Sequence, residues 1–392
     1  MVHAHGKSGP ARRVGLVIVV VALSLLGMEL VARRRFPLRG FLYRIDSERI
    51  HTTQPGARRL QLMPPATGDP RVLVELNSLG LRGPELRVAE RRMLVVGDSL
   101  VLGANVSRRF TFAVQLEERL AASGVDWEVL NAGAESYGPD QTLLQLEEQL
   151  PLLNPDEVVL VLCANNDFGD LHRNKLFGIE SNGELKRQKI QLGKALLQLF
   201  DYRSRVSAQP ALWRIARHWR RLRNASIPGG EDWIGLYLRA ARFQYQDAVV
   251  QRSPVVDDVE RDTYDADMSI HPEWPSSEHK RKLMTLVLAR IASVCEAAEA
   301  RLTVVVVPSA VDVAPNSVIQ VEAERFPTYN PLALSSALSE CALEAGIDTL
   351  DLTEMFLASD PATLFSSPED FHWNARAQAL AADLWVERMG GV

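Results

Sequence analysis

The sequence predicts an α/β protein built on a parallel sheet with helices on both faces, preceded by one apolar helix. From residue 93 onward, short apolar runs alternate with segments of helical periodicity, which is the pattern of strand–helix–strand units. The first run, Met93 to Val96, is apolar throughout, as expected of a strand buried on both faces. The third observation is a long apolar segment close to the N-terminus.

That apolar segment predicts a membrane anchor over residues 14–32, after a basic tail over residues 1–13. Its 19 residues are close to the roughly 20 needed to cross a bilayer as a helix. A cleaved signal peptide is the alternative, but no small-x-small cleavage site follows the segment. Arg33, Arg34 and Arg35 come directly after it, which by the positive-inside rule favours a cytoplasmic domain.

Residues 33–90 are rich in Arg, Pro and Gly and lack sustained periodicity, so we expect a connector that packs loosely. Residues 91–392 then form the main domain. Its expected strands cover residues 93–96, 127–130, 158–163, 302–307 and 349–352. Its expected helices cover residues 109–122, 139–150, 278–300, 332–345 and 374–389.

Residues 170–277 interrupt this alternation and are expected to form a helical insertion. Within them, residues 212–223 carry apolar side chains at helical spacing on one face and arginines on the other. Such a helix could lie on a membrane surface or form a lid. A cap helix with a solvated basic face is the simpler interpretation, and we favour it.

Composition excludes several classes of protein. The 392 residues are 46% hydrophobic and carry a net charge of −5, which argues against nucleic-acid binding. The three cysteines form no C-x-x-C pair, so neither a disulfide framework nor a zinc site is expected. We expect no metal and no cofactor.

The first strand runs directly into Gly97-Asp98-Ser99-Leu100. A serine at a carboxyl strand end and at a helix start has an exposed hydroxyl and a free N–H, which suits a nucleophile. A helix N-cap explains the same residue equally well when the triplet is considered alone.

Three more segments carry polar groups or glycine at strand ends or before the last helix. Gly133 follows the second strand, where its N–H can approach a ligand closely, or where it simply forms a turn. Asn166 follows the third strand and is either a neutral donor or part of an Asn-Asp turn. His372, with Asp370 two residues before it, is either a base held in one tautomer or a surface histidine.

Together these motifs resemble the four blocks of the SGNH/GDSL hydrolases. The resemblance covers roughly residues 72–390, apart from the insertion. The stretches 77–83 and 131–141 are similar to the membrane-anchored bacterial branch of that family. The resemblance implies a flavodoxin-like, three-layer fold. It also implies a catalytic set of Ser99, His372 and Asp370, with an oxyanion hole formed by Ser99, Gly133 and Asn166.

Two positions depart from the family pattern. Ala164 stands where the third block usually begins with glycine. The last block is usually Asp-x-x-His, whereas here Glu369 lies three residues before His372 and Asp370 two before. We expect Asp370 to orient the histidine, with Glu369 as the alternative. The Asp-x-His-Trp-Asn variant is associated with relatives that act on acylated saccharides.

The expected function is therefore that of a single-pass membrane serine esterase that hydrolyses acyl esters, in particular O-acetyl esters on saccharides. The alternatives are an O-acyltransferase acting on a cell-surface polysaccharide and a catalytically silent glycan-binding or scaffold domain. The family resemblance favours a periplasmic or extracellular domain, against the arginine count after the anchor.

Overall fold

The structure is a computed structural model, and it describes residues 10–35, 42–62, 71–189, 192, 210–213, 234–235, 238, 242, 245 and 264–389. Most of the expected insertion lies outside the described residues. The helix expected over residues 212–223 also lies outside them, except for its first two positions.

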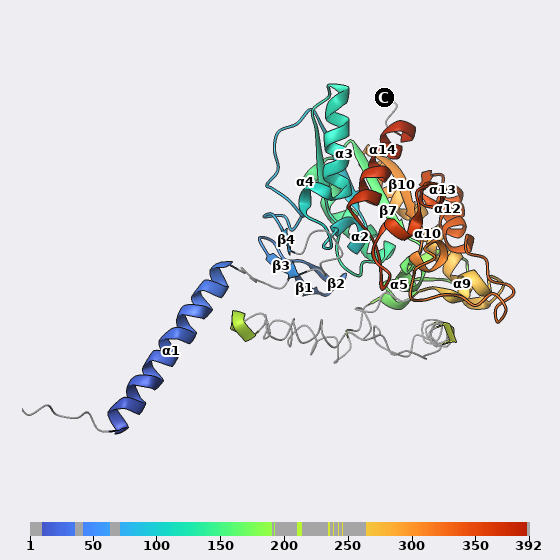
Figure 1. Cartoon of the computed structure of the whole chain (residues 1–392). Coiled ribbons are helices and arrows are strands. Elements are labelled where there is room, and N and C mark those ends of the chain that lie inside the picture. Colours follow the sequence, from blue (N-terminus) through green and yellow to red (C-terminus); the bar gives the residue numbers. More distant parts are fainter. Residues whose placement is uncertain are drawn as a thin grey trace, which may run out of the picture.

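The centre of the domain is a five-stranded parallel sheet (Figure 1). Its strands are β5 (Arg91–Val96), β6 (Trp127–Asn131), β7 (Glu157–Cys163), β10 (Arg301–Val307) and β11 (Asp348–Asp351). They lie in the order β11-β10-β7-β5-β6. Read from the β6 edge and numbered by their order in the chain, the strands are arranged 2-1-3-4-5. This is the flavodoxin-like arrangement, which confirms the predicted fold class. Its topological switch point lies between β5 and β7, where ligands bind in such sheets.

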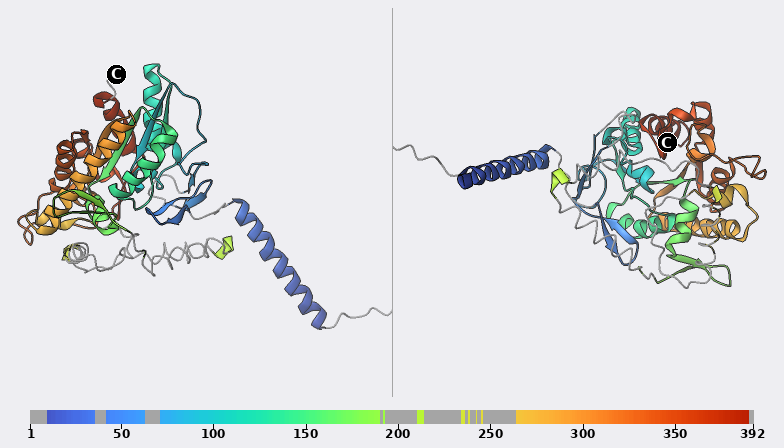
Figure 2. Two further views of the ribbon diagram at one scale, coloured as in Figure 1. Left: turned by 180° about the vertical axis from the view of Figure 1, so that it is seen from behind. Right: turned by 60° about the horizontal axis from the view of Figure 1, so that its bottom comes forward.

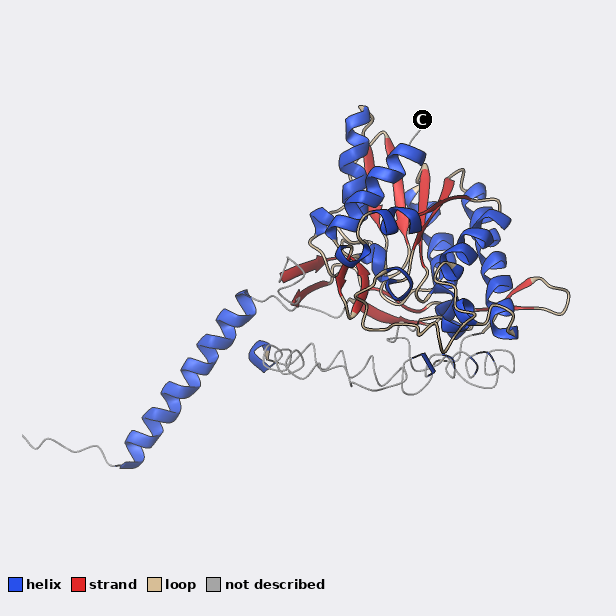
Figure 3. Cartoon of the chain, turned by 45° about the vertical axis from the view of Figure 1, so that its right-hand side comes forward, coloured by secondary structure: helices blue, strands red, loops and turns tan. Residues whose placement is uncertain are grey.

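Successive side chains of each strand point to opposite faces of the sheet, so both faces are apolar. Helices cover both of these faces (Figure 3). Leu94 and Val96 point into the core that contains α4 (Pro139–Leu153), α10 (Pro275–Ala297) and α12 (Ala333–Glu344). Met93 and Val95 point into the other core, which contains α3 (Phe112–Leu120) and α14 (Ala375–Met389).

Shorter elements complete the described fold. The short helices are α2 (Ser99–Leu102), α5 (Asp167–Asn174), α9 (Ala266–Ile270), α11 (Ala310–Val313), α13 (Thr353–Ala358), η2 (Arg108–Phe110), η3 (Ala121–Ser123) and η4 (Pro361–Thr363). The antiparallel strand pairs are β1 (Tyr43–Asp46) with β2 (Ile50–Thr53), β3 (Arg58–Leu62) with β4 (Arg71–Glu75), β8 (Phe177–Ile179) with β9 (Leu185–Arg187), and β12 (Phe365–Ser367) with β13 (Asp370–Trp373).

The segment expected as a loose connector is more ordered than its sequence indicated. It contains β1 to β4, and its apolar side chains form a third core with residues that follow Ser99 and Gly133. Arg82 is buried and donates to the carbonyl oxygens of Leu102, Gly103 and Val106 at the end of α2. These short strands mix polar or charged side chains with apolar ones and form no continuous apolar run, which is why the sequence did not reveal them.

The N-terminal helix α1 (Pro10–Arg35) projects from the domain (Figures 1 and 2). Its segment Val14–Arg34 contains an 18-residue window with a mean hydropathy of 2.6 and no buried residue, so it is long and apolar enough to cross a membrane. Near its end, the Glu29 carboxylate accepts hydrogen bonds from the N–H groups of Ala211 and Leu212, at 2.8 and 3.1 Å.

Candidate active site

The predicted residues Ser99, Gly133 and Asn166 follow β5, β6 and β7, which are neighbours in the sheet. All three strands are parallel, so these residues gather at one edge of the sheet, beside the switch point. The turn from β5 into α2 requires glycine at position 97. Its φ is +148°, and a Cβ there would lie 2.6 Å from the Val161 carbonyl oxygen.

Ser99 is the first residue of α2, and Asp98 caps that helix by accepting the Leu100 N–H at 2.8 Å. The N-cap role that the sequence left open for Ser99 is therefore filled by Asp98. The Ser99 N–H has no hydrogen-bond partner among the described residues, as expected in the first turn of a helix.

Ser99, His372 and Asp370 form a continuous hydrogen-bonded chain. His372 Nε2 lies 2.8 Å from Ser99 Oγ, and His372 Nδ1 lies 2.5 Å from Asp370 Oδ1. Asp370 Oδ1 also accepts the His372 backbone N–H at 3.0 Å, which holds the carboxylate and the imidazole in one short turn. Asp370 is thus the acid in contact with His372, whereas the Glu369 side chain is exposed.

Side chains whose role the sequence did not reveal hold β13 in place. Trp373 is fully buried and its indole N–H donates to the Leu100 carbonyl oxygen at 2.9 Å, which ties the histidine strand to α2. Asn105 donates to the Trp373 carbonyl oxygen at 2.9 Å. Asn374 caps α14 by accepting the N–H groups of Arg376 and Ala377. The only signal in the sequence was the Trp-Asn pair directly after His372.

Gly133 packs directly against α2. A Cβ at this position would lie 2.1 Å from the Leu102 nitrogen, so no larger residue fits without moving the backbone. This close approach gives the glycine a steric role in addition to any binding role. The Gly133 N–H donates to Asn131 Oδ1 at 3.1 Å.

Asn166 is fully buried at the start of α5, and its Nδ2 donates to Asp170 Oδ2 at 2.5 Å. Its side chain also lowers the pKa of Asp98, so Asn166 lies between two carboxylates. Asp170 in turn forms a buried ion pair with Arg173.

The aspartates near Ser99 have opposite pKa shifts. Burial opposes ionisation of Asp370, but the charge of His372 and its hydrogen bonds outweigh burial and lower the pKa of Asp370. Burial raises the pKa of Asp98 to about 6, even though the Leu100 N–H and His372 act in the other direction. Burial, together with the charge of Asp98, also raises the pKa of Asp167 well above its usual range.

A second buried charge cluster fixes the chain beyond the insertion against this edge. The Asp265 carboxylate accepts the Gly169 N–H at 2.8 Å, and its backbone N–H donates to the Asn165 carbonyl oxygen at 3.1 Å. Lys280 is fully buried and contacts Asp265 and Asp267 at 2.8 and 2.7 Å. Residues 264–277, expected within the insertion, are therefore part of the packed domain around the Asn166 turn.

This arrangement provides a hydroxyl, an imidazole and a carboxylate in series, which is the geometry of a serine nucleophile with its base and orienting acid. Across the part of the chain that the structure describes, no group of three or more His, Cys, Asp or Glu side chains could hold a metal ion.

Comparison with known proteins found no matching family model and no matching curated protein. Several solved structures are similar at low identity. A lipase/acylhydrolase from Enterococcus faecalis is 11% identical at a TM-score of 0.37, and the match covers 77% of this chain and 96% of that one. The acetyl xylan esterase AlAXEase is 15% identical at a TM-score of 0.34, with coverage of 76% and 100%. A mutant of Axe2, an acetyl-xylooligosaccharide esterase from Geobacillus Stearmophilus, is 11% identical at a TM-score of 0.38, with coverage of 78% and 96%. These relatives are esterases or lipases, but the similarity is too low to assign a family or an activity to this chain.

Proposed function

We propose that this protein is a serine esterase of the SGNH/GDSL type, with Ser99 as nucleophile, His372 as base and Asp370 as orienting acid. The observation that carries the proposal is the chain of hydrogen bonds from Ser99 through His372 to Asp370, at 2.8 and 2.5 Å. Ser99 and His372 are 273 positions apart in the chain, and a serine–imidazole–carboxylate series is what nucleophilic catalysis requires.

In the proposed reaction, Ser99 Oγ attacks the ester carbonyl while His372 Nε2 takes the hydroxyl proton. Asp370 keeps the proton on His372 Nδ1 and stabilises the imidazolium that forms. The imidazolium then gives its proton to the departing alcohol. Water, activated by the same imidazole, hydrolyses the acyl-enzyme.

The oxyanion would be held by the N–H of Ser99, the N–H of Gly133 and the amide of Asn166. The Ser99 N–H supports this role best, because it lies at a helix start with no partner among the described residues. The Gly133 N–H and the Asn166 amide donate to Asn131 and Asp170, so each would have to share or exchange its present acceptor.

We further propose that the substrate is an O-acyl ester, in particular an O-acetyl ester on a saccharide. This rests on the Asp370-x-His372-Trp373-Asn374 variant and its resemblance to relatives that act on acylated saccharides. Helix α1 would anchor the enzyme as a single membrane span, with the domain in the periplasm or outside the cell. A C-terminal alkaline phosphatase fusion tests this orientation, and activity only of a cytoplasmic reporter would overturn it.

The test of the reaction uses the full chain in a neutral detergent with p-nitrophenyl acetate as substrate. Ser99→Ala should abolish hydrolysis and labelling by a fluorophosphonate probe, while Ser181→Ala, which changes an exposed serine, should leave both intact. Equal hydrolysis by Ser99→Ala would remove Ser99 from the mechanism. An unlabelled wild-type chain would indicate a silent binding domain.

Product analysis with saccharide acceptors separates hydrolysis from acyl transfer. Free acetate as the product supports the esterase, whereas acetylated acceptor formed in preference to acetate would indicate an O-acyltransferase that uses the same Ser99.

A further inference from the structure

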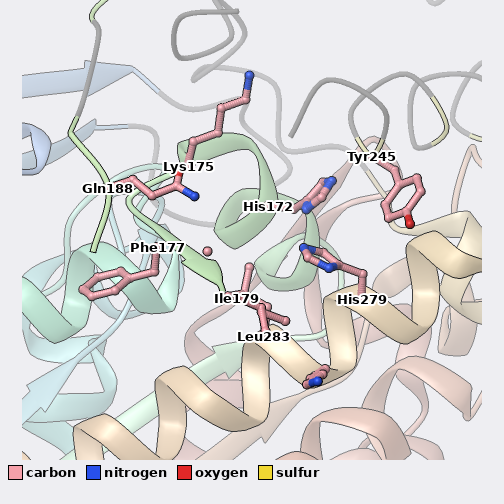
Figure 4. Close-up of a pocket in the computed structure, with 10 residues that line it drawn as sticks. His172, Lys175, Phe177, Ile179, Gln188, Tyr245, His279 and Leu283 are labelled. Atoms are coloured by element: carbon pink, nitrogen blue, oxygen red, sulfur yellow. The ribbon is translucent and has the colours of Figure 1, made fainter. Parts of the chain in front are cut away.

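A cavity of about 300 Å³ lies away from Ser99, between the end of α5, the β8–β9 hairpin and α10 (Figure 4). Its polar lining comes from His172, Lys175, Gln188, Tyr245, His279 and Lys282. Asn166 is at the opposite end of α5, whose eight residues span roughly 12 Å. The cavity is therefore separate from the proposed catalytic centre.

The charges around this cavity have one sign. Lys175 and Lys282 contribute two ammonium groups, and no carboxylate side chain is among the described residues that line it. Burial lowers the pKa of His279, and the charge of Lys282 lowers it further. Another cation is thus disfavoured at this place, whereas an anion would be attracted.

One wall of the cavity is a cluster of rings. The His172 and His279 rings meet edge to face with centroids 5.3 Å apart, and Tyr245 stacks on His172 at 6.2 Å (Figure 4). Phe177 and Leu283 add apolar surface. A ligand with a flat or apolar body could pack on this wall while its charged group meets the lysines.

The opposite side is shaped by the β8–β9 hairpin. A Cβ at Gly178 would lie 2.1 Å from Gln188 Nε2, so glycine at this position lets the Gln188 amide lie across the strand. The amide is a neutral donor on this side of the cavity. The Lys175 side chain points away from it (Figure 4), and the Lys282 ammonium group lies near Gly183 in the hairpin turn, so both flexible lysines would turn inward to meet carboxylate or phosphate oxygens beside the amide.

We propose that this cavity binds a small anionic ligand, whose carboxylate or phosphate oxygens are held by Lys175, Lys282 and Gln188 while its body packs against the His172–His279 wall. The volume is at the small end of ligand-binding sites and suits a single ring with one anionic substituent. The proposal does not depend on the esterase reaction.

The test titrates the full chain, labelled at its histidine rings, in a neutral detergent and follows the ring resonances by NMR. Inorganic phosphate and D-glucuronate are the two probes, and glucose is the neutral control. We expect at least one anion to shift the His172 and His279 resonances saturably. Response to phosphate alone would indicate a phosphorylated ligand, and response to glucuronate alone an acidic sugar.

The double variant Lys175→Met/Lys282→Met should weaken this binding at least tenfold and leave p-nitrophenyl acetate hydrolysis unchanged. Lys186→Met is the matched control, because Lys186 lies on the same hairpin, is exposed and pairs with Glu180 outside the cavity. If the double variant does not stay folded, Lys282→Gln, at an exposed position, replaces it. Absence of saturable shifts with both anions, equal shifts with glucose, or unchanged affinity in the lysine variants would overturn the proposal.

Discussion

Asp98 and Asp370 both lie close to His372, yet their surroundings have opposite effects on their charge. Asp370 is partly exposed and bonded to the imidazole, which lowers its pKa. Asp98 is buried and receives the Leu100 N–H, but it has no direct ion pair among the described residues, and burial raises its pKa to about 6. The pKa of Asp370 is lowered because His372 lies within hydrogen-bonding distance, whereas the pKa of Asp98 is raised because burial removes its carboxyl group from water.

This difference indicates separate roles. A carboxylate that remains ionised can orient an imidazole and stabilise its positive charge. A buried carboxyl group with a raised pKa is more easily protonated, and the Asp98 oxygen serves instead as the acceptor that caps α2. The expected roles of Asp98 and Asp370 therefore follow from the surroundings of each carboxyl group, and not from how far each residue lies from Ser99 in the chain.

Asp265 and Asp267 represent a third situation, because both are buried but share the cation Lys280. Burial acts to lower the pKa of Lys280, but the two carboxylates outweigh it and raise that pKa. Each charge in this cluster offsets the free-energy cost of burying the opposite charge. Removing one member leaves the remaining buried charges without a partner of opposite sign, which destabilises the fold.

The largest expected effect distinguishes the first two aspartates. Asp370→Asn should lower kcat for p-nitrophenyl acetate by about 10³- to 10⁴-fold, because the amide cannot hold the tautomer that leaves Nε2 free to act as base. Asp98→Asn keeps an N-cap acceptor and should change kcat by less than about tenfold. Steady-state kinetics of the two purified variants measures both values.

Glu369→Gln is the control for Asp370→Asn, because it removes a neighbouring exposed carboxylate. Its activity should equal that of the wild type. A greater loss in Glu369→Gln than in Asp370→Asn would transfer the orienting role to Glu369.

The next effect concerns stability. Lys280→Met should lower the free energy of unfolding by about 3–5 kcal/mol, because it leaves two buried carboxylates without their cation. Lys186→Met removes an exposed, paired lysine and should cost no more than about 1 kcal/mol. Urea denaturation of both variants compares them, and equal midpoints would contradict the compensation described for the cluster.

The sheet and the candidate site residues were predictable because they depend on local patterns. Met93 to Val96 is apolar at every position, so a strand buried on both faces was the natural interpretation, and parallel topology then brings Ser99, Gly133 and Asn166 to one edge. Each of these residues comes shortly after an expected strand, so its place at the carboxyl end of that strand could be read from the sequence.

The supporting contacts were not predictable, because they join positions far apart that have no distinctive local pattern. Lys280 lies in a helix whose sequence gives no sign that this lysine is buried with two carboxylates. Arg82 gives no sign that it caps α2 from a segment without clear periodicity. The choice between Asp370 and Glu369 also required coordinates, since both stand close to His372 in the chain.

The Asn166 side chain, placed between Asp98 and Asp170, gives the third prediction. Asn166→Ala should lower kcat by about 10²- to 10³-fold with a much smaller change in KM, if its amide stabilises the oxyanion. Steady-state kinetics with a short acyl ester measures both constants. A purely structural role would instead lower the melting temperature and leave kcat of the folded fraction unchanged.

The smallest effect is the pH dependence of stability. Burial raises the folded-state pKa of Asp98 to about 6 and that of Asp140 to about 7. Between pH 8 and 6 the folded chain therefore binds protons that the unfolded chain, with carboxyl pKa values near 4, does not bind, so acidification stabilises the fold in this window. Asp370 has a lowered pKa, and the stability that it contributes is lost only at lower pH.

His279 acts in the opposite direction below about pH 6.5, because burial lowers its folded-state pKa and the unfolded chain then binds the extra proton. The melting temperature should accordingly rise by about 2–4 °C from pH 8 to pH 6.5. Asp140→Asn should reduce that rise, because its side-chain oxygen can still accept the Gln141 N–H but no longer titrates. Asp370→Asn should leave the rise unchanged. Two results would contradict the opposite pKa shifts of Asp140 and Asp370. One is a melting temperature that falls from pH 8 to pH 6.5, and the other is an equal reduction of the rise in Asp140→Asn and Asp370→Asn.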